Sequence, residues 1–153
     1  MARPKLIAST SSLEEWQESH RERQERCELV RRWLDQPAFT TDVIVGFPGE
    51  TDEDFEQTCR LVREAGFSKV HIFPFSPRRG TPAAQMPDQV SDRVRSERGK
   101  ELAAIEGELR EQYFRSLIGR NLRVLLEARS DATAEHAVGT SCRYAPVRHT
   151  SCG

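Results

Sequence analysis

The chain has 153 residues, of which 31% are charged, and its formal net charge at pH 7 is -1. This length is enough for one domain, or for one domain and a small module. The near-neutral charge removes a bulk electrostatic reason to bind nucleic acid but leaves room for a local basic patch. No apolar run approaches the length of a membrane span, and residues 1–16 lack the apolar core of a secretory signal. We therefore expect a cytoplasmic protein with no membrane partner.

The first predicted element is a charged helix from Leu13 to Asp35, which Pro37 ends. The segment from Phe39 to Val45 predicts a strand. Its consecutive β-branched residues favour burial on both faces, as in a parallel sheet.

A second helix is predicted from about Asp52 to Ala65. Thr51 and Asp54 have the spacing of an N-terminal capping pair, and Gly66 is typical of a C-terminal stop. The segment from Lys69 to Phe75 predicts another strand. Strand, helix and strand in this order indicate a βαβ unit with parallel strands.

A loop rich in proline and glycine follows, and then a long helix from Ser91 to about Ile118, ended by Gly119. After Gly119 the composition changes. Residues 121–127 and 138–147 predict short strands, so a boundary is expected near this glycine.

The four cysteines, Cys27, Cys59, Cys142 and Cys152, are widely separated. None belongs to a C-x-x-C pair of the kind that holds zinc or forms a redox disulfide. We expect reduced thiols with structural roles and no metal site.

The loop from Gly46 to Glu50 lies at the carboxyl end of a predicted parallel strand, the edge at which α/β folds bind ligands. Gly46 lets a ligand approach the backbone, and Phe47 is held extended by the proline after it. Pro48 and Gly49 are typical of a type II turn. The acids at positions 50 and 52–54 complement the helix dipole and would repel phosphate, which favours a neutral heterocycle or a cationic group. A tight strand-to-helix connection with a charged cap explains the same residues.

Two strings stand in order in this part of the chain: TDVIVGFPGETDEDF from Thr41 to Phe55, and HIFPFSPRRGTPAA from His71 to Ala84. Together they resemble the radical-SAM tRNA methylthiotransferases, and the second is most similar to the branch that acts on threonylcarbamoyladenosine. The string GRNLRVLLE, residues 119–127, resembles the start of a TRAM module.

The resemblance implies an α/β fold in three parts. Residues 1–38 form an N-terminal segment with a helix, residues 39–118 the C-terminal part of a radical-SAM partial (β/α) barrel, and residues 119–153 a short, incomplete TRAM-like β module. It also implies S-adenosylmethionine and iron–sulfur clusters as the cofactors of the intact family, and tRNA as its partner. The residues that would border the cofactor are Gly46, Phe47, Pro48, Gly49, Phe75 and Ser76, and no residue is assigned to catalysis.

Five arginines are candidate RNA contacts: Arg78, Arg79, Arg120, Arg123 and Arg143. Arginine pairs with phosphate in many nucleic-acid interfaces, and a solvated surface explains the same residues. Tyr144 is a candidate for stacking on a base, with packing in the small sheet as the alternative.

The family binds its catalytic cluster through C-x-x-x-C-x-x-C, and the sequence contains no such triplet. We therefore expect that this chain alone holds no cofactor stably. We interpret it as the C-terminal portion of a methylthiotransferase that adds a methylthio group to a modified adenosine in tRNA, and not as a catalyst by itself. An exposed sheet edge would favour association of the isolated chain. The alternative is a non-catalytic RNA-binding remnant or a truncated paralogue.

Overall fold

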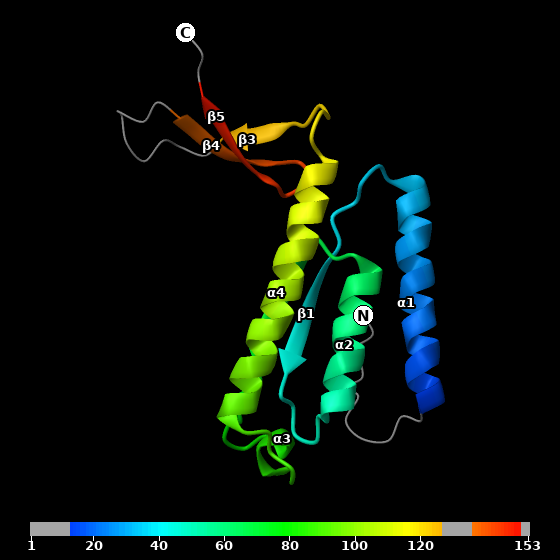
Figure 1. Ribbon diagram of the computed structural model, residues 1–153, viewed down its shortest axis with the longest axis vertical. Coiled ribbons are helices and arrows are strands. Elements are labelled where there is room, and N and C mark those ends of the chain that lie inside the picture. Colours follow the sequence, from blue (N-terminus) through cyan, green and yellow to red (C-terminus); the bar gives the residue numbers. More distant parts are fainter. Residues whose placement is uncertain (1–12, 127–135, 151–153) are drawn as a thin grey trace. The chain divides into compact units, whose positions relative to one another are not determined.

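The computed structural model describes residues 13–126 and 136–150 (Figure 1). The chain divides into two units, Met1–Asp35 and Gln36–Gly153. The first contains helix α1, Leu13–Trp33, which confirms the expected helix with a slightly earlier end. Arg31 and Arg32 lie in its last turn, where their charges complement the negative end of the helix dipole.

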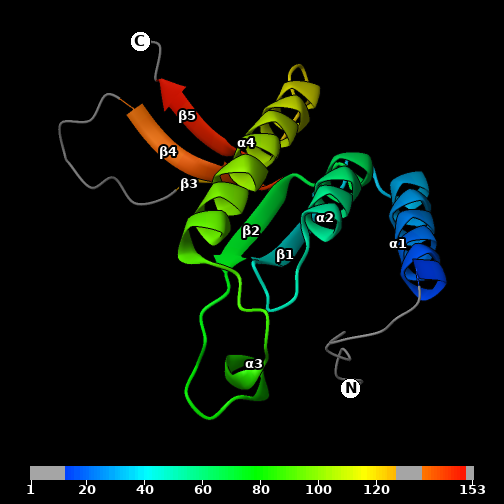
Figure 2. The same cartoon turned by 60° about the horizontal axis from the view of Figure 1, so that its bottom comes forward.

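The second unit begins with a βαβ arrangement: strand β1, Thr40–Val45, helix α2, Asp52–Ala65, and strand β2, Lys69–Pro74. The two strands are parallel, with Thr40 opposite Lys69 and Val45 opposite Pro74 (Figure 2). This confirms the predicted parallel pairing, and with it the α/β class. The amino ends of both strands are joined through the Phe39 carbonyl, which accepts hydrogen bonds from the backbone N and the Oγ of Ser68, each at 2.8 Å.

Helix α2 has the predicted ends because its cap is complete. The Asp54 backbone N donates to Thr51 Oγ1 at 3.1 Å, and the Thr51 backbone N donates to Asp54 Oδ2 at 3.0 Å. These bonds satisfy two N–H groups that the first helical turn leaves without partners. Gly66 ends the helix with φ 62°, a conformation that glycine adopts without steric cost.

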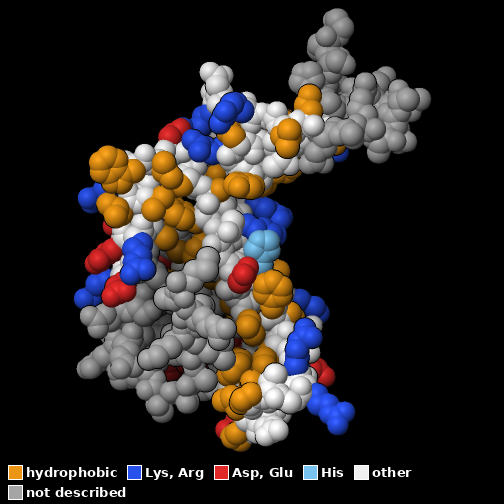
Figure 3. All heavy atoms as spheres, turned by 180° about the vertical axis from the view of Figure 1, so that it is seen from behind, with side chains coloured by type: hydrophobic (Ala, Val, Ile, Leu, Met, Phe, Trp, Pro, Cys, Tyr) orange, Lys and Arg blue, Asp and Glu red, His pale blue; other side chains and the backbone are white. Residues whose placement is uncertain are grey.

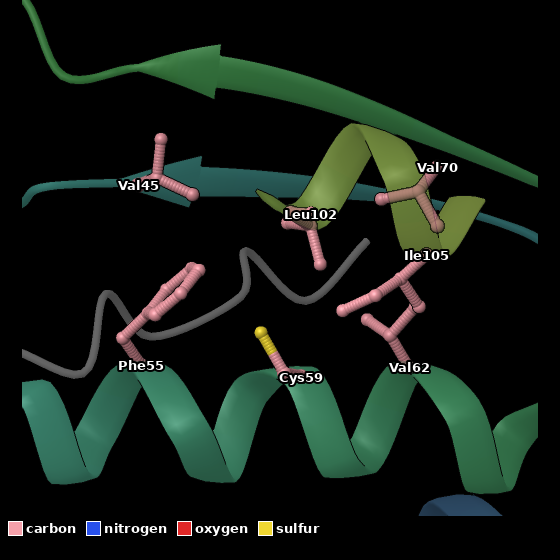
Figure 4. Packing of buried hydrophobic residues seen from close by; sticks show 7 residues of the cluster. All are labelled: Val45, Phe55, Cys59, Val62, Val70, Leu102 and Ile105. Carbon is pink, nitrogen blue, oxygen red and sulfur yellow. The ribbon is translucent and has the colours of Figure 1, made fainter. Parts of the chain in front are cut away.

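The core lies on one face of the β1–β2 sheet. Two helices cover this face, α2 and the long helix α4, Asp92–Ser116. Side chains from both helices point toward the strands (Figure 4). The buried cluster consists of Val45, Phe55, Cys59, Val62, Val70, Leu102 and Ile105.

The prediction that β1 is buried on both faces is wrong. Val45 is fully buried, but its neighbour Ile44 is 53% exposed, and Phe73 on β2 is 51% exposed. Successive side chains of a strand point to opposite faces, and both covering helices contribute to the cluster on the Val45 face. Hydrophobic side chains are also gathered on the surface seen in Figure 3.

The loop after β2 contains one helical turn, α3, Pro82–Gln85. Helix α4 then starts at its N-cap Ser91, whose side chain accepts a hydrogen bond from the Val94 backbone N at 3.4 Å. It ends shortly before Gly119, which has φ 81°. Among the described residues, no helix is long and apolar enough to cross a membrane.

A small antiparallel sheet completes the second unit. It has the order β3–β4–β5, with β3 at Val124–Leu126, β4 at His136–Ser141 and β5 at Pro146–Thr150. Residues 138–147, expected as a strand, are instead a hairpin, because Tyr144 takes a positive φ of 58° and turns the chain. The boundary expected near Gly119 lies inside the second unit and stays a prediction.

Replacement of Leu102 by alanine should destabilise the protein by about 2–5 kcal/mol, because it leaves a cavity in a site that is fully buried. Urea denaturation followed by circular dichroism would measure the change. The matched control is Leu125→Ala, since Leu125 is 75% exposed and its loss should matter little. Equal unfolding midpoints for the two variants would contradict the assigned core.

Candidate functional site

The loop after β1 is a tight turn of the predicted kind. The Glu50 backbone N donates to the Phe47 carbonyl at 2.9 Å, which closes a four-residue turn around Pro48 and Gly49. Gly49 has φ 84°, as the third residue of a type II turn requires. Gly46 and Pro48 are buried, Phe47 is half-buried and Gly49 is exposed. The predicted turn chemistry is therefore confirmed.

The second predicted loop meets the first at the carboxyl edge of the sheet. The Phe75 backbone N donates to the Val45 carbonyl at 2.8 Å. The rings of Phe47 and Phe75 touch edge to face, with centroids 5.2 Å apart and planes at 71°. The next residue, Ser76, is exposed to solvent. The fold thus brings the two strings together, with an aromatic pair where they join.

Arg98 of α4 fixes the loop from the other side. Its Nη1 donates to Glu50 Oε2 at 2.5 Å and to the Glu50 carbonyl at 3.1 Å, and its Nη2 donates to Asp52 Oδ1 at 2.7 Å. The same Glu50 Oε2 accepts a hydrogen bond from the Gly46 backbone N at 2.7 Å. Only 7% of the Arg98 side chain and 13% of the Glu50 side chain are exposed. The buried guanidinium therefore holds the Glu50 end of the loop directly, and the Gly46 end through the Glu50 carboxylate.

Arg98 stays protonated in this site. Burial of the guanidinium lowers its pKa, but hydrogen bonds to Asp52 and Glu50, together with their negative charges, outweigh burial and raise the pKa of Arg98. The guanidinium carbon also lies 5.5 Å from the centre of the Phe55 ring, within cation–π range. The buried Glu50 carboxylate is thus paired with Arg98. Asp52 shares the same cation through a side chain that is 95% exposed, so the three groups together keep one negative charge.

Gly46 is required by packing. Its φ is 73°, and a Cβ at this position would collide with the side chain of Arg95. Arg95 is in turn paired with Asp92. The side chain of Arg95 takes the space beside the Gly46 Cα. The glycine is therefore explained by packing, and the close approach of a ligand to it stays a prediction.

The loop after β2 is tied to this edge as well. The Gly49 backbone N donates to the Asp88 carbonyl at 3.0 Å. Arg78 and Arg79 are exposed in a turn closed by Thr81, whose backbone N and Oγ1 donate to the Arg78 carbonyl at 3.1 and 2.8 Å.

The other three arginines of the predicted RNA set lie elsewhere. Arg120 follows α4, where its Nε donates to the Ser116 carbonyl at 3.2 Å. Arg123 is exposed just before β3. Arg143 is half-buried in the β4–β5 turn and lines a pocket with Lys69, at the amino end of β2. The five arginines therefore do not form one patch, and their contact with RNA stays a prediction.

The described cysteines do not fit an iron–sulfur cluster. Cys59 is part of the core, and burial raises the pKa of its thiol, which disfavours the thiolate that binds iron. Cys142 is exposed in the turn between β4 and β5. Across residues 13–126 and 136–150, no group of three His, Cys, Asp or Glu side chains is placed to hold a metal ion. Cys152 lies outside the described residues.

Sequence reasoning missed Arg98, although the sequence contained a signal for it. Val94 and Leu102 are in the apolar stripe of α4, and Arg98 lies between them at four-residue spacing. An arginine inside such a stripe is buried only when it is paired. Its acidic partners, Glu50 and Asp52, lie at the start of α2.

No family model matches the chain. The chain is 47% identical over 113 residues to a tRNA-2-methylthio-N(6)-dimethylallyladenosine synthase of Kineococcus radiotolerans, covering 72% of this chain and 22% of the relative. It is 42% identical over 109 residues to a ribosomal protein uS12 methylthiotransferase of Anaeromyxobacter sp., covering 71% and 23%. It is 40% identical over 125 residues to the threonylcarbamoyladenosine tRNA methylthiotransferase of Bacillus subtilis, covering 80% and 28%.

These similarities, together with the βαβ unit and its paired loops, define the class as methylthiotransferases. The chain belongs to the radical-SAM methylthiotransferase family, which confirms the resemblance seen in the sequence. It spans about a quarter of the length of the curated relatives it matches.

Replacement of Arg98 by methionine should destabilise the protein by about 3 kcal/mol, because Glu50 is then left buried without its partner. It should also speed hydrogen exchange at the Gly46 and Gly49 amides. Urea denaturation and exchange followed by NMR would measure both effects. Arg93→Met is the control, since Arg93 forms a surface pair with Glu97 and its side chain is 78% exposed. Unchanged exchange in Arg98→Met would contradict the proposed anchoring.

The two described cysteines of the second unit should react with iodoacetamide at very different rates. Cys142 is exposed and should be alkylated quickly, whereas Cys59 is 3% exposed with a raised thiol pKa and should react only as the protein unfolds. Peptide mass spectrometry with and without urea would measure this. Equal labelling of both in native protein would show that Cys59 is not in the core.

Proposed function

We propose that this chain forms part of a radical-SAM methylthiotransferase that places a methylthio group on a modified adenosine of tRNA. The observation that carries the proposal is the meeting of Phe47 and Phe75 at the carboxyl edge of two parallel strands. Both residues lie in the strings that resemble the family, and this edge is where α/β folds bind their ligands.

The loop residues suit an S-adenosylmethionine site. A half-buried aromatic pair offers an apolar wall for a neutral heterocycle, and no exposed carboxylate of Glu50 opposes it, because Arg98 holds that group. We propose that Gly46, Phe47, Pro48, Gly49, Phe75 and Ser76 border the cofactor. In the family, S-adenosylmethionine together with an iron–sulfur cluster activates the C–H bond that is replaced. The residues described here position the cofactor and exclude water from it, and none of them is assigned to the cluster.

We also propose that residues 39–118 correspond to part of a (β/α) barrel and residues 119–153 to part of a TRAM-like module. The open face of the β1–β2 sheet supports the first assignment, because a barrel strand has its helices on one side only. The antiparallel order β3–β4–β5 supports the second. On this proposal the enzyme acts in the cytoplasm, and its contacts with tRNA are made by five arginines: Arg78, Arg79, Arg120, Arg123 and Arg143.

The choice of tRNA over ribosomal protein follows the sequence resemblance, since relatives named for both substrates match the chain. A chimaera tests it. Residues 39–118 of this chain would replace the matching segment of the threonylcarbamoyladenosine tRNA methylthiotransferase of Bacillus subtilis. Mass spectrometry of digested tRNA from a strain that lacks its own enzyme would then measure the methylthio nucleoside.

We expect the chimaera to restore the product and its Phe47→Ala form to lose most of it, because the aromatic pair is broken. Arg60→Gln is the control, since Arg60 is exposed on α2 away from the loops. A chimaera that folds and carries its cluster but forms no product on tRNA would contradict the proposal. Methylthiolation of ribosomal protein in place of tRNA would contradict the choice of substrate.

A further inference from the structure

The open face of the β1–β2 sheet carries three residue pairs, one after another. Side chains alternate between the two faces of a strand, so residues two positions apart share the face opposite the buried core. The register sets these residues opposite one another as Ile44 and Phe73, Asp42 and His71, and Thr40 and Lys69. Successive pairs are about 7 Å apart along the strands. Hydrophobic, acidic, histidine and basic side chains follow one another on the surface seen in Figure 3.

The first pair continues the wall of the proposed cofactor site. Ile44 and Phe73 are both exposed. Phe73 lies two residues before Phe75, whose ring meets that of Phe47 at the carboxyl edge of the sheet. Nucleobases pack with their flat faces on aromatic side chains. A base held beside the cofactor would therefore find an apolar surface one step along the sheet.

The second pair offers a hydrogen-bond donor beside an acceptor. Asp42 and His71 are exposed and lie at the same level of the two neighbouring strands. An imidazole donates at least one N–H in either tautomer, and an aspartate carboxylate accepts from N–H or O–H groups. A substituent that both accepts and donates would satisfy both side chains. A hydrocarbon substituent would cover them and satisfy neither, which costs binding free energy.

The third pair lies at a cationic end of the face. Lys69 Nζ and Arg110 Nη1 approach the same oxygen of Glu106, at 3.1 and 3.5 Å. The Glu106 side chain is only 8% exposed, so its carboxylate is held between the two cations. One carboxylate shared by two cations leaves this group with a positive charge. A carboxylate on a ligand would be attracted to it.

The face becomes concave at this end. The amino-edge pocket is a cavity of about 1090 Å³ that Thr40, Lys69 and His71 line together with α4 and the β4–β5 turn. The acid in its lining, Glu111, is paired with Arg115 at 2.6 Å, so it does not cancel the charge beside Lys69. The pocket therefore gives the end of a ligand room to reach Lys69.

We propose that this face binds the target nucleoside and that His71, with Asp42, determines which substituent is accepted. The chemistry of the face runs from apolar through hydrogen-bonding to cationic. An adenine that carries an amino acid through a urea-type linkage has the same order: an aromatic ring, then N–H and C=O groups, then a carboxylate. Threonylcarbamoyladenosine is a nucleoside of this kind. That the ligand is a modified adenosine rests on the proposed function.

Titration of the full, isotope-labelled chain with two free nucleosides, followed by NMR, tests the proposal. Threonylcarbamoyladenosine has a polar, acidic substituent, and dimethylallyladenosine has a hydrocarbon one. The first should bind on the order of tenfold more tightly, because it gains hydrogen bonds to charged groups. It should also shift the signals of His71 and Phe73. Its methyl ester lacks the negative charge and should bind more weakly than the free acid.

Two variants of His71 separate recognition from folding. His71→Phe should bind dimethylallyladenosine more tightly than the unmodified chain does, because an apolar ring replaces a donor; loss of folding cannot imitate this gain. His71→Gln keeps an N–H donor and should retain most of the preference for threonylcarbamoyladenosine. Arg60→Gln is the control, since Arg60 is exposed on α2, and it should leave both affinities unchanged.

Equal affinities of the unmodified chain for the two nucleosides, an unchanged preference in His71→Phe, or signals of His71 that do not move would each overturn the proposal. So would signals of His71 that shift with protein concentration alone, since a second copy of the chain would then cover this face. The titration needs neither cofactor nor turnover. A chimaera that forms no product therefore leaves the assignment of His71 standing, and a failed titration leaves the chimaera result standing.

Discussion

The guanidinium of Arg98 is the constraint on which the carboxyl edge of the sheet depends. It bridges α4 to the loop that follows β1, and its partner Glu50 turns back to satisfy the Gly46 amide. An ion pair at this depth is stabilising only when its remaining hydrogen-bonding groups are also satisfied. Here the Arg98 guanidinium also donates to the Glu50 carbonyl and to Asp52 Oδ1. Helix α4 therefore does more than cover the core, because it also sets the shape of the turn.

This arrangement gives the two edges of the sheet different chemistry. At the carboxyl edge, the buried Glu50 is paired with Arg98 and the rings of Phe47 and Phe75 meet edge to face, which suits a neutral aromatic group. At the amino edge, two cations share the single carboxylate of Glu106, which suits an anion. Both properties depend on α4, since Arg98 and Glu106 both belong to it.

Much of the fold was predictable because it rests on local rules. The cap of α2 follows from Thr51 and Asp54, and the parallel pairing follows from a β-branched run before a capped helix. The open face of the sheet was not predictable from β1 alone, since Ile44 and Val45 are chemically alike and only the placement of α2 and α4 distinguishes their environments.

The sites divide in the same way. The turn after β1, which is proposed to border the cofactor, was predictable because consecutive residues determine its geometry. Arg98 was not, because its partner Glu50 is 48 positions away. The amino-edge pocket was not found either, apart from Arg143 and Tyr144, because its lining comes from segments between Ala38 and Pro146 that only the tertiary fold brings together.

The Phe39 carbonyl, which joins the amino ends of β1 and β2, has a consequence for how the chain folds. Its bond to Ser68 closes a loop of 29 residues, whereas the β4–β5 hairpin closes through a four-residue separation between Ser141 and Ala145. The entropy lost on closing a loop grows with its length, and contacts between distant residues slow folding. The hairpin can therefore form while the parallel strands are still apart. Assembly of the two edges then waits on the slower, long-range step that docks α2 and α4 on a newly paired sheet.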